Sequence, residues 1–326
     1  MIPLLLAGAG GVGLLGGGLA AFSGATARKI EKAVPRDGEL IEVNGDTLHY
    51  VDRGGSGPAI VMIHGLGGQM RNFAGAMVDD LARDYRVVLV DRPGSGYSVR
   101  APGRSARLRV QAETIAEFIR KLKLDRPLLV GHSLGGALSL SVALNHPDVV
   151  GGLALIAALT QVEAETDIPP VFKPLIIRSR TMRRAVAWTM ATPMGMLKTE
   201  EALKQIFAPE PVPEDFGTAG GGLLAIRPSN FYASSSDVVD LEGELEGMVD
   251  RYASLSVPVS ILYGRGDNLL AYAKHGEKTA AEISGGEVDI VEGGHMLPFT
   301  QPELSAAFVR RAAARVEPAD ARHAAE

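Results

Sequence analysis

The sequence predicts an α/β protein with a mostly parallel central sheet covered by helices on both faces. Short apolar runs recur along the chain and alternate with longer segments of helical periodicity. Several runs are apolar at almost every position, which is typical of parallel strands buried on both faces. The 326 residues are enough for one large domain with a sizeable core.

The composition excludes several classes of function. The net charge is −5 and basic residues are interspersed with acidic ones, so we expect no nucleic-acid partner. The chain contains no cysteine, which rules out disulfides, thiolate metal sites and a cysteine nucleophile.

Residues 1–27 form a separate hydrophobic segment, which we expect to be a helix. No charged side chain occurs from Ile2 to Ala27, and this length exceeds the ~20 residues that span a bilayer. The stretch "GAGGVG" at 8–13 matches a dinucleotide fingerprint, but the strand ending in an acid that this motif needs does not follow. We therefore predict a single membrane anchor. The alternative is a signal peptide cleaved after "ATA" at 25–27, although no Lys or Arg precedes the apolar core.

The flanks of this segment bear on its orientation and partners. Four basic residues lie after it, so the positive-inside rule favours a cytoplasmic location for the rest of the chain, with export after cleavage as the alternative. They are Arg28, Lys29, Lys32 and Arg36.

Small residues recur every four positions within the segment, a pattern that lets membrane helices approach closely and allows a homodimer. They are Ala9, Gly13, Gly17, Ala21 and Ala25.

After a linker at 28–38, strands and helices alternate in a regular order. A hairpin is predicted over 39–54 around Asn44-Gly45, a pair suited to a tight turn. Further strands are predicted at 59–65, 86–91, 127–132, 152–158, 258–264 and 287–294. Helices are predicted at 72–83, 105–124, 134–145, 271–284 and 302–315.

A long insertion interrupts this alternation. Residues 160–255 contain clustered prolines and methionines and no convincing core strand, which favours a helical lid between core segments 39–159 and 256–316. The large apolar residues of the lid are expected in its core rather than around a pocket. They are Met182, Trp188, Met190, Met194 and Met196. The Ala-rich, charged tail at 317–326 is expected to fray.

The stretch "PLLVGHSLGGALS" at 127–139 places Ser133 at a sharp corner between a strand and a helix. It satisfies G-x-S-x-G in the context that defines a nucleophile elbow. Gly131 and Gly135 leave space where a β-carbon would collide, and the strained turn exposes the serine hydroxyl. Ser133 is therefore the candidate nucleophile.

A serine nucleophile needs a base and an acid that orients the base. Asp267 in "GRGDNLL" and His295 in "EGGHMLP" each follow a strand, at the edge where open α/β sheets collect their sites. Asp91 in "DRPG" is a rival acid for which a turn role is sufficient. His132 is expected to point away from Ser133.

Two backbone amides are candidates for an oxyanion hole. "HGLGG" at 64–68 leaves a predicted strand on flexible backbone, so the Leu66 amide could point at a developing oxyanion. The Leu134 amide begins the helix after the nucleophile and could supply the second donor. His64 is expected to brace this loop.

From about Glu39 to Val316 the chain resembles capped, esterase-like members of the α/β-hydrolase fold. The resemblance rests on "HGLGG", "DRPGSGYS" at 91–98, "GHSLGG", "GRGD" and "GGHMLP", and on the order Ser, Asp, His. It implies hydrolysis through an acyl-enzyme, with the cap shaping the substrate pocket. Haloalkane dehalogenases and epoxide hydrolases of this fold use an aspartate where this chain has Ser133, which disfavours those chemistries.

The sequence thus predicts a serine hydrolase that cleaves a carboxylic ester with an apolar acyl or alcohol part. Ser133 attacks, His295 transfers the proton, Asp267 orients His295, and the amides of Leu66 and Leu134 stabilise the oxyanion. No metal or organic cofactor is expected. A carbon-carbon bond hydrolase or perhydrolase with the same triad is an alternative, and so is a non-catalytic ligand-binding protein on this fold.

Overall fold

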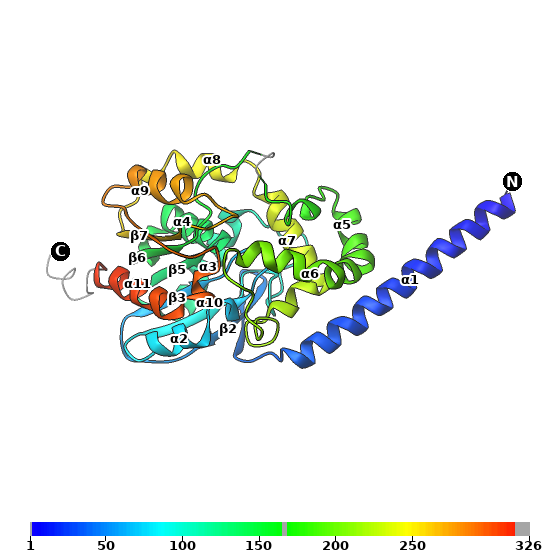
Figure 1. Cartoon of the computed structure of the whole chain (residues 1–326), viewed down its shortest axis with the longest axis horizontal. Coiled ribbons are helices and arrows are strands. Elements are labelled where there is room, and N and C mark those ends of the chain that lie inside the picture. The colour runs from blue at the N-terminus through cyan, green and yellow to red at the C-terminus, as the bar shows by residue number, and fades with distance from the viewer. Residues whose placement is uncertain (1, 165–167, 317–326) are drawn as a thin grey trace.

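The structure is a computed structural model that describes residues 2–164 and 168–316, with the side chains of residues 2–13 not described. Figure 1 shows a compact α/β body, with a long N-terminal helix extending from it. The tail predicted at 317–326 lies outside the described residues.

The central sheet has eight strands in the order β1-β2-β4-β3-β5-β6-β7-β8. The pairs β1–β2 and β2–β4 are antiparallel, and every later pair is parallel. This confirms the predicted sheet with its antiparallel start. The strands are β1 (Glu39–Val43), β2 (Asp46–Asp52), β3 (Ala59–Ile63), β4 (Arg86–Val90), β5 (Leu128–His132), β6 (Gly152–Ile156), β7 (Val259–Gly264) and β8 (Glu287–Val291).

The β1–β2 hairpin turns at Asn44 and Gly45, as predicted. Both residues have positive φ, 52° and 85°, and Val43 pairs with Asp46 across the turn. Asparagine and glycine tolerate the left-handed conformation that a two-residue turn requires, so this pair sets the register of the hairpin.

Helices cover both faces of the sheet, which confirms the predicted fold class. Along β3, Val61 and Ile63 pack into one core while Ile60 and Met62 pack into the other, because successive side chains point to opposite faces. Helices α3 (Leu108–Lys121) and α4 (Leu134–Asn145) contribute to the first core, and α2 (Gly75–Leu81) and α11 (Pro302–Ala314) to the second.

Some helix boundaries differ from the prediction. Helix α3 begins at Leu108 rather than 105, because Ser105 Oγ and the Ala106 amide donate to Asp240 at 2.7 Å outside the helix. The helix predicted over 271–284 is a π-helical turn, η8 (Ala273–Lys278), followed by α9 (Thr279–Glu282). The one predicted over 72–83 is reduced to the turn η1 (Met70–Asn72) and α2.

The segment between β6 and β7 folds into a helical cap beyond the carboxyl ends of the parallel strands (Figure 1). Its helical elements are η4 (Lys173–Leu175), α5 (Arg180–Val186), η5 (Ala187–Ala191), α6 (Thr192–Phe207), η6 (Gly222–Ile226) and α7 (Pro228–Asp240). The end of the segment, α8 (Glu244–Val249) and η7 (Tyr252–Ser254), packs into the first core of the main body instead.

The expectation that the large apolar side chains of the cap form its core is wrong. Met182, Trp188, Met190, Met194 and Met196 are each between 44% and 57% exposed. The cap core is built instead from aromatic residues: Phe207 and Phe216 pack edge to face, with Phe299 of the main body against both. Helix α1 is the outer neighbour of the π-turn η5, with Trp188 beside Gly24, but it leaves Trp188 and these methionines about half exposed.

The predicted N-terminal helix is present as α1 (Ile2–Ala33). It continues through the first half of the predicted linker and ends before Pro35, because proline restricts the preceding residue and cannot donate a helical hydrogen bond. Over the described part of the chain, no helix combines the length and the apolar character that crossing a membrane requires. Membrane association of α1 therefore stays a prediction.

The last turns of α1 are fastened to the body. Ile30 and Val34 pack with Leu224 of the cap. Two polar contacts join the same region, since Arg227 pairs with Glu31 at 3.0 Å and the Tyr97 hydroxyl donates to the Val34 carbonyl at 2.5 Å. The end of α1 thus contacts both the cap and the loop that follows β4.

Candidate active site

Ser133 occupies the corner between β5 and α4 in a strained conformation, with φ 54° and ψ −122°. Its carbonyl accepts from Gly136 at 2.9 Å and Leu159 at 3.0 Å, and its amide donates to Ile156 at 3.1 Å. A positive φ is unfavourable for serine, so these hydrogen bonds stabilise the strained backbone conformation of Ser133.

Two glycines make the corner possible, as the sequence predicted. A β-carbon at Gly135 would lie 2.0 Å from the carbonyl oxygen of Ile63. One at Gly131 would lie 2.6 Å from both the Gly135 carbonyl and the Gly136 α-carbon. Any side chain at either position would therefore push α4 away from the sheet.

His295 and Asp267 form a buried pair at the same edge of the sheet. His295 Nδ1 lies 2.8 Å from Asp267 Oδ2, and the two side chains are 5% and 0% exposed. Asp267 Oδ1 accepts from the amides of Leu269 and Leu270 at 2.8 and 3.0 Å. Burial acts to raise the pKa of Asp267, but His295 and the two amides outweigh it and hold this pKa below its usual value.

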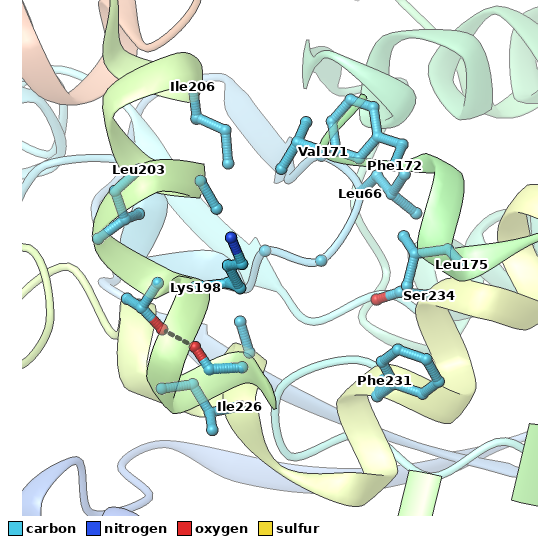
Figure 2. Close-up of a pocket in the computed structure, with 18 of the residues that line it drawn as sticks. Leu66, Val171, Phe172, Leu175, Lys198, Leu203, Ile206, Ile226, Phe231 and Ser234 are labelled. Atoms are coloured by element: carbon cyan, nitrogen blue, oxygen red, sulfur yellow. Dashed lines mark hydrogen bonds between the residues drawn. The ribbon is translucent and has the colours of Figure 1, made fainter. Parts of the chain in front are cut away.

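Two cavities meet at Ser133. We call them cavity A, of about 470 Å³, and cavity B, of about 260 Å³; Ser133, His295, Leu66, Phe172 and Leu269 line both. Figure 2 shows the mainly apolar side chains around cavity A, which come from the cap except for Leu66 among those labelled, with the Lys198 ammonium among them. The further apolar residues of cavity A include Val171, Leu175, Met190, Met194, Leu203, Ile206, Phe216 and Phe231.

The two proposed oxyanion donors lie beside Ser133. Leu66 lines both cavities and Leu134 lines cavity B. Leu134 is the first residue of α4, so its amide has no partner within the helix. No acceptor is recorded for the Leu66 amide among residues 2–164 and 168–316. The geometry leaves both amides available to a ligand.

His132 and His64 are buried near Ser133 but are held in other contacts. The ring Nε2 of His132 lies 2.9 Å from the His295 carbonyl, and burial lowers the pKa of His132 to about 3, with His295 acting in the same direction. His64 Nδ1 lies 2.9 Å from the Gly65 carbonyl, and its Nε2 accepts from the Arg92 amide at 2.9 Å. Burial and the Arg92 charge lower the pKa of His64 to about 4, so both rings are neutral at pH 7.

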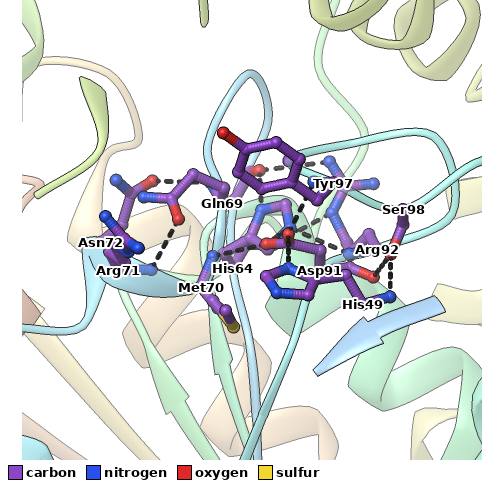
Figure 3. A network of polar contacts seen from close by, with 12 residues as sticks. His49, His64, Gln69, Met70, Arg71, Asn72, Asp91, Arg92, Tyr97 and Ser98 are labelled. Carbon is purple, nitrogen blue, oxygen red and sulfur yellow. Dashed lines mark hydrogen bonds and ion pairs between the residues drawn. The ribbon is translucent and has the colours of Figure 1, made fainter. Parts of the chain in front are cut away.

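The rival acid Asp91 belongs to a different network of polar contacts, which includes His49 (Figure 3). It pairs with His49 at 2.8 Å and accepts from the amides of Met70 and Tyr97, both at 2.8 Å. Burial acts to raise the pKa of Asp91, but the hydrogen bond with His49, the electrostatic influence of His64 and His49, and the Tyr97 amide together hold this pKa below its usual value. Asp91 lines neither cavity. Because its carboxylate accepts from the Met70 amide, it anchors the end of the loop that carries Leu66.

A second anchor, which the sequence analysis did not predict, is the pair between Arg92 and Asp237. Arg92 is fully buried; its Nε and NH2 donate to the carbonyls of His64 and Gly65 at 3.0 and 3.1 Å, and its NH1 lies 2.9 Å from Asp237 on cap helix α7. Asp237 also pairs with Arg100 at 2.7 Å. The pair thus ties the oxyanion loop to the cap. The motif "DRPG" at 91–94 contains Arg92 but does not indicate Asp237 as its partner.

Comparisons with known proteins agree with this architecture. A family model for the alpha/beta hydrolase fold matches residues 58–302. An uncharacterized protein from Mycobacterium tuberculosis is 27% identical over 286 residues, covering 82% of this chain and 78% of that protein. An esterase from Thermogutta terrifontis superposes with a TM-score of 0.68 at 21% identity, over 84% of this chain and 97% of the other. A bacterial membrane phospholipase A superposes with a TM-score of 0.67 at 23% identity, over 96% and 97%.

Proposed function

The chain belongs to the α/β-hydrolase fold family, and from that premise we propose that it is a serine hydrolase of carboxylic esters with an apolar acyl or alcohol part. One observation carries the proposal. Ser133 lies on a strained elbow where two apolar cavities meet, and His295 lines both of these cavities.

The reaction would proceed through an acyl-enzyme. Ser133 Oγ attacks the ester carbonyl while His295 accepts its proton, and the carbonyl electron pair moves onto oxygen, facing the amides of Leu66 and Leu134. Collapse of this intermediate expels the alcohol, which takes the proton from His295. Water, deprotonated by His295, then releases the acid. Asp267 stabilises the imidazolium and keeps the ring oriented.

The shape of the site supports an ester with two apolar arms. Cavities A and B diverge from Ser133, so one arm can enter each while the ester carbonyl lies at the serine. Cavity A has the larger volume and is assigned to the longer arm. Burying each additional methylene stabilises the complex by about 0.8 kcal/mol, which favours medium-length chains over acetate.

The proposal is tested with purified protein and p-nitrophenyl esters of graded chain length. A fluorophosphonate probe should label wild-type protein, and Ser133→Ala should abolish both labelling and ester turnover. A diketone substrate is assayed in parallel. Diketone cleavage without ester turnover would replace this proposal with carbon-carbon bond hydrolysis, and binding without any turnover would identify a ligand-binding protein.

For location, we propose that α1 holds the enzyme at a membrane, with the hydrolase domain cytoplasmic. The uncharged stretch from Ile2 to Ala27 and the basic residues Arg28, Lys29 and Lys32 that follow support this proposal. Export after cleavage of residues 1–27 is the alternative. A homodimer through the small residues of α1 stays a prediction.

A further inference from the structure

A third cavity, of about 510 Å³, lies apart from Ser133 and is lined by five arginines. It is bounded by the loop after β4, by α5 and η5, and by α7, and it shares no lining residue with cavities A and B. We call it the arginine groove; its charged residues are Arg100, Arg104, Arg180, Arg183, Arg184 and Asp240.

The cationic charge of the groove is only partly neutralised. Arg104 faces Asp46 at 3.2 Å, and Arg100 shares Asp237 with Arg92. Asp240 accepts hydrogen bonds from Ser105 and Ala106 rather than from an arginine. One carboxylate therefore serves two guanidinium groups, which leaves an excess of positive charge beside the groove.

Arg183 is a buried cation with only neutral partners. Arg183 is 3% exposed, and its guanidinium group donates to the Ile177 carbonyl and to Ser236 Oγ. Among the described residues, every hydrogen-bond partner of its guanidinium group is therefore neutral. Burial holds the pKa of Arg183 below its usual range, partly against the influence of Tyr232 and Asp240. An anion in the groove would stabilise this charge.

Arg100 has a donor without an acceptor. Its side chain is 10% exposed, and its Nε has no hydrogen-bond partner among the described residues. Arg180 and Arg184 are exposed at the rim, one turn apart on α5. Guanidinium groups on two sides of a cavity match the several oxygens of a phosphate, which accepts paired hydrogen bonds.

We propose that the arginine groove binds a phosphate group, carried by a lipid headgroup or by a free phosphate. Trp188, which lines the groove, also lies beside α1 at Gly24, three residues before the uncharged stretch ends. At 1.5 Å per residue this places the groove within about 5 Å of that end along the helix. If α1 enters a bilayer, the groove lies at the level of the headgroup phosphates.

The first arm of the test titrates inorganic phosphate into the full chain in detergent, at constant ionic strength. Wild-type protein should bind phosphate saturably. Arg180→Gln with Arg184→Gln should weaken binding about tenfold or more, because the variant loses two guanidinium groups that can donate charge-assisted hydrogen bonds to the phosphate. The matched control is Arg109→Gln with Arg311→Gln, two arginines on α3 and α11 that are 67% and 62% exposed. Arg183→Lys, which keeps the charge but not the planar fork, should also bind phosphate more weakly.

The second arm measures flotation with phosphatidylcholine vesicles, with and without phosphatidic acid. A preference for phosphatidic acid that the groove variant loses and the control keeps identifies a lipid source. Phosphate binding without that preference identifies a free phosphate. The proposal is overturned by no saturable phosphate binding together with no lipid preference, or by equal binding in the groove and control variants. Unfolding curves without phosphate establish that each variant is folded.

Discussion

His295 Nδ1 lies 2.8 Å from Asp267 Oδ2, and the other oxygen of that carboxylate accepts from two backbone amides. Asp267→Asn cannot satisfy all three donors, because the amide group presents one acceptor and one donor. The histidine would then lose its orienting acceptor or change tautomer. We expect kcat for a p-nitrophenyl ester to fall roughly 10³- to 10⁴-fold.

Asp289→Asn is the matched control for that experiment, since Asp289 is a 49% exposed carboxylate on the neighbouring strand β8. It should retain the kcat of the wild-type protein. If Asp267→Asn retained kcat within tenfold while remaining folded, Asp267 would not be the orienting acid, and Asp91→Asn would become the next variant to measure.

Stability should fall in mild acid because His64 and His132 are buried in neutral form. Burial lowers their pKa values to about 4 and about 3, so below the unfolded value near 6.5 the unfolded chain binds protons that the folded chain does not. The free energy of unfolding should therefore decrease from pH 6.5 towards pH 4, by on the order of 1.4 kcal/mol per pH unit for each histidine.

Denaturant unfolding at several pH values measures this slope. His132→Gln keeps a donor for the His295 carbonyl but cannot be protonated. Its free energy of unfolding should therefore fall by about 1.4 kcal/mol less per pH unit than that of the wild-type protein. The comparison of slopes holds even if the variant is less stable at pH 7. Identical slopes in the two proteins would contradict a neutral, buried His132.

Removing the charge of Asp237 should destabilise the protein strongly. Asp237 is 2% exposed and neutralises both Arg92 and Arg100, so Asp237→Asn would leave the buried guanidinium of Arg92 and the largely buried one of Arg100 without a carboxylate. We expect a loss of about 3–5 kcal/mol in the free energy of unfolding. Glu200→Gln, which removes an exposed partner of Lys204, should change it by about 0–1 kcal/mol.

The same variant tests whether the pair positions the oxyanion loop. Arg92 holds the carbonyls of His64 and Gly65, next to the Leu66 amide. In conditions where Asp237→Asn is folded, kcat should fall more than KM changes, because the donor acts on the transition state. An unchanged kcat would restrict this pair to a stabilising role.

Chain-length preference should respond to the volume of cavity A. Ala202 is half-buried and lines cavity A, whereas Val239 is half-buried and lines cavity B. Ala202→Phe should lower kcat/KM for an octanoyl ester relative to an acetyl ester by about tenfold. Val239→Phe adds a ring to cavity B and should leave that ratio nearer the wild-type value. Equal shifts in both variants would contradict the assignment of the longer arm to cavity A.

The full chain should sediment with membranes, whereas a variant that begins at Arg28 should remain in the supernatant. The shorter variant keeps Glu31 and Val34, which contact Arg227 and Tyr97, so the attachment of α1 to the body is preserved. It should also retain ester turnover. Isolation of a natural mature chain beginning at Arg28 in an exported fraction would show that residues 1–27 are a signal peptide.

Much of the fold and of the candidate site could be predicted from local sequence. Apolar runs, the Asn44-Gly45 turn and the glycines at 131 and 135 indicate strands, a hairpin and an elbow, because these features depend on near neighbours in the chain. The positions of Asp267 and His295 also follow from sequence, since residues after parallel strands meet at one edge of the sheet.

Only the tertiary structure determined how distant segments complete the site. Arg92 and Asp237 are 145 positions apart, and nothing local indicates that a cap helix neutralises the arginine that holds the oxyanion loop. The exposure of the cap methionines and the grouping of five arginines in one groove have the same origin. The sequence shows which side chains are apolar and which are charged. Which of them become buried or paired depends on which surfaces the folded chain brings into contact.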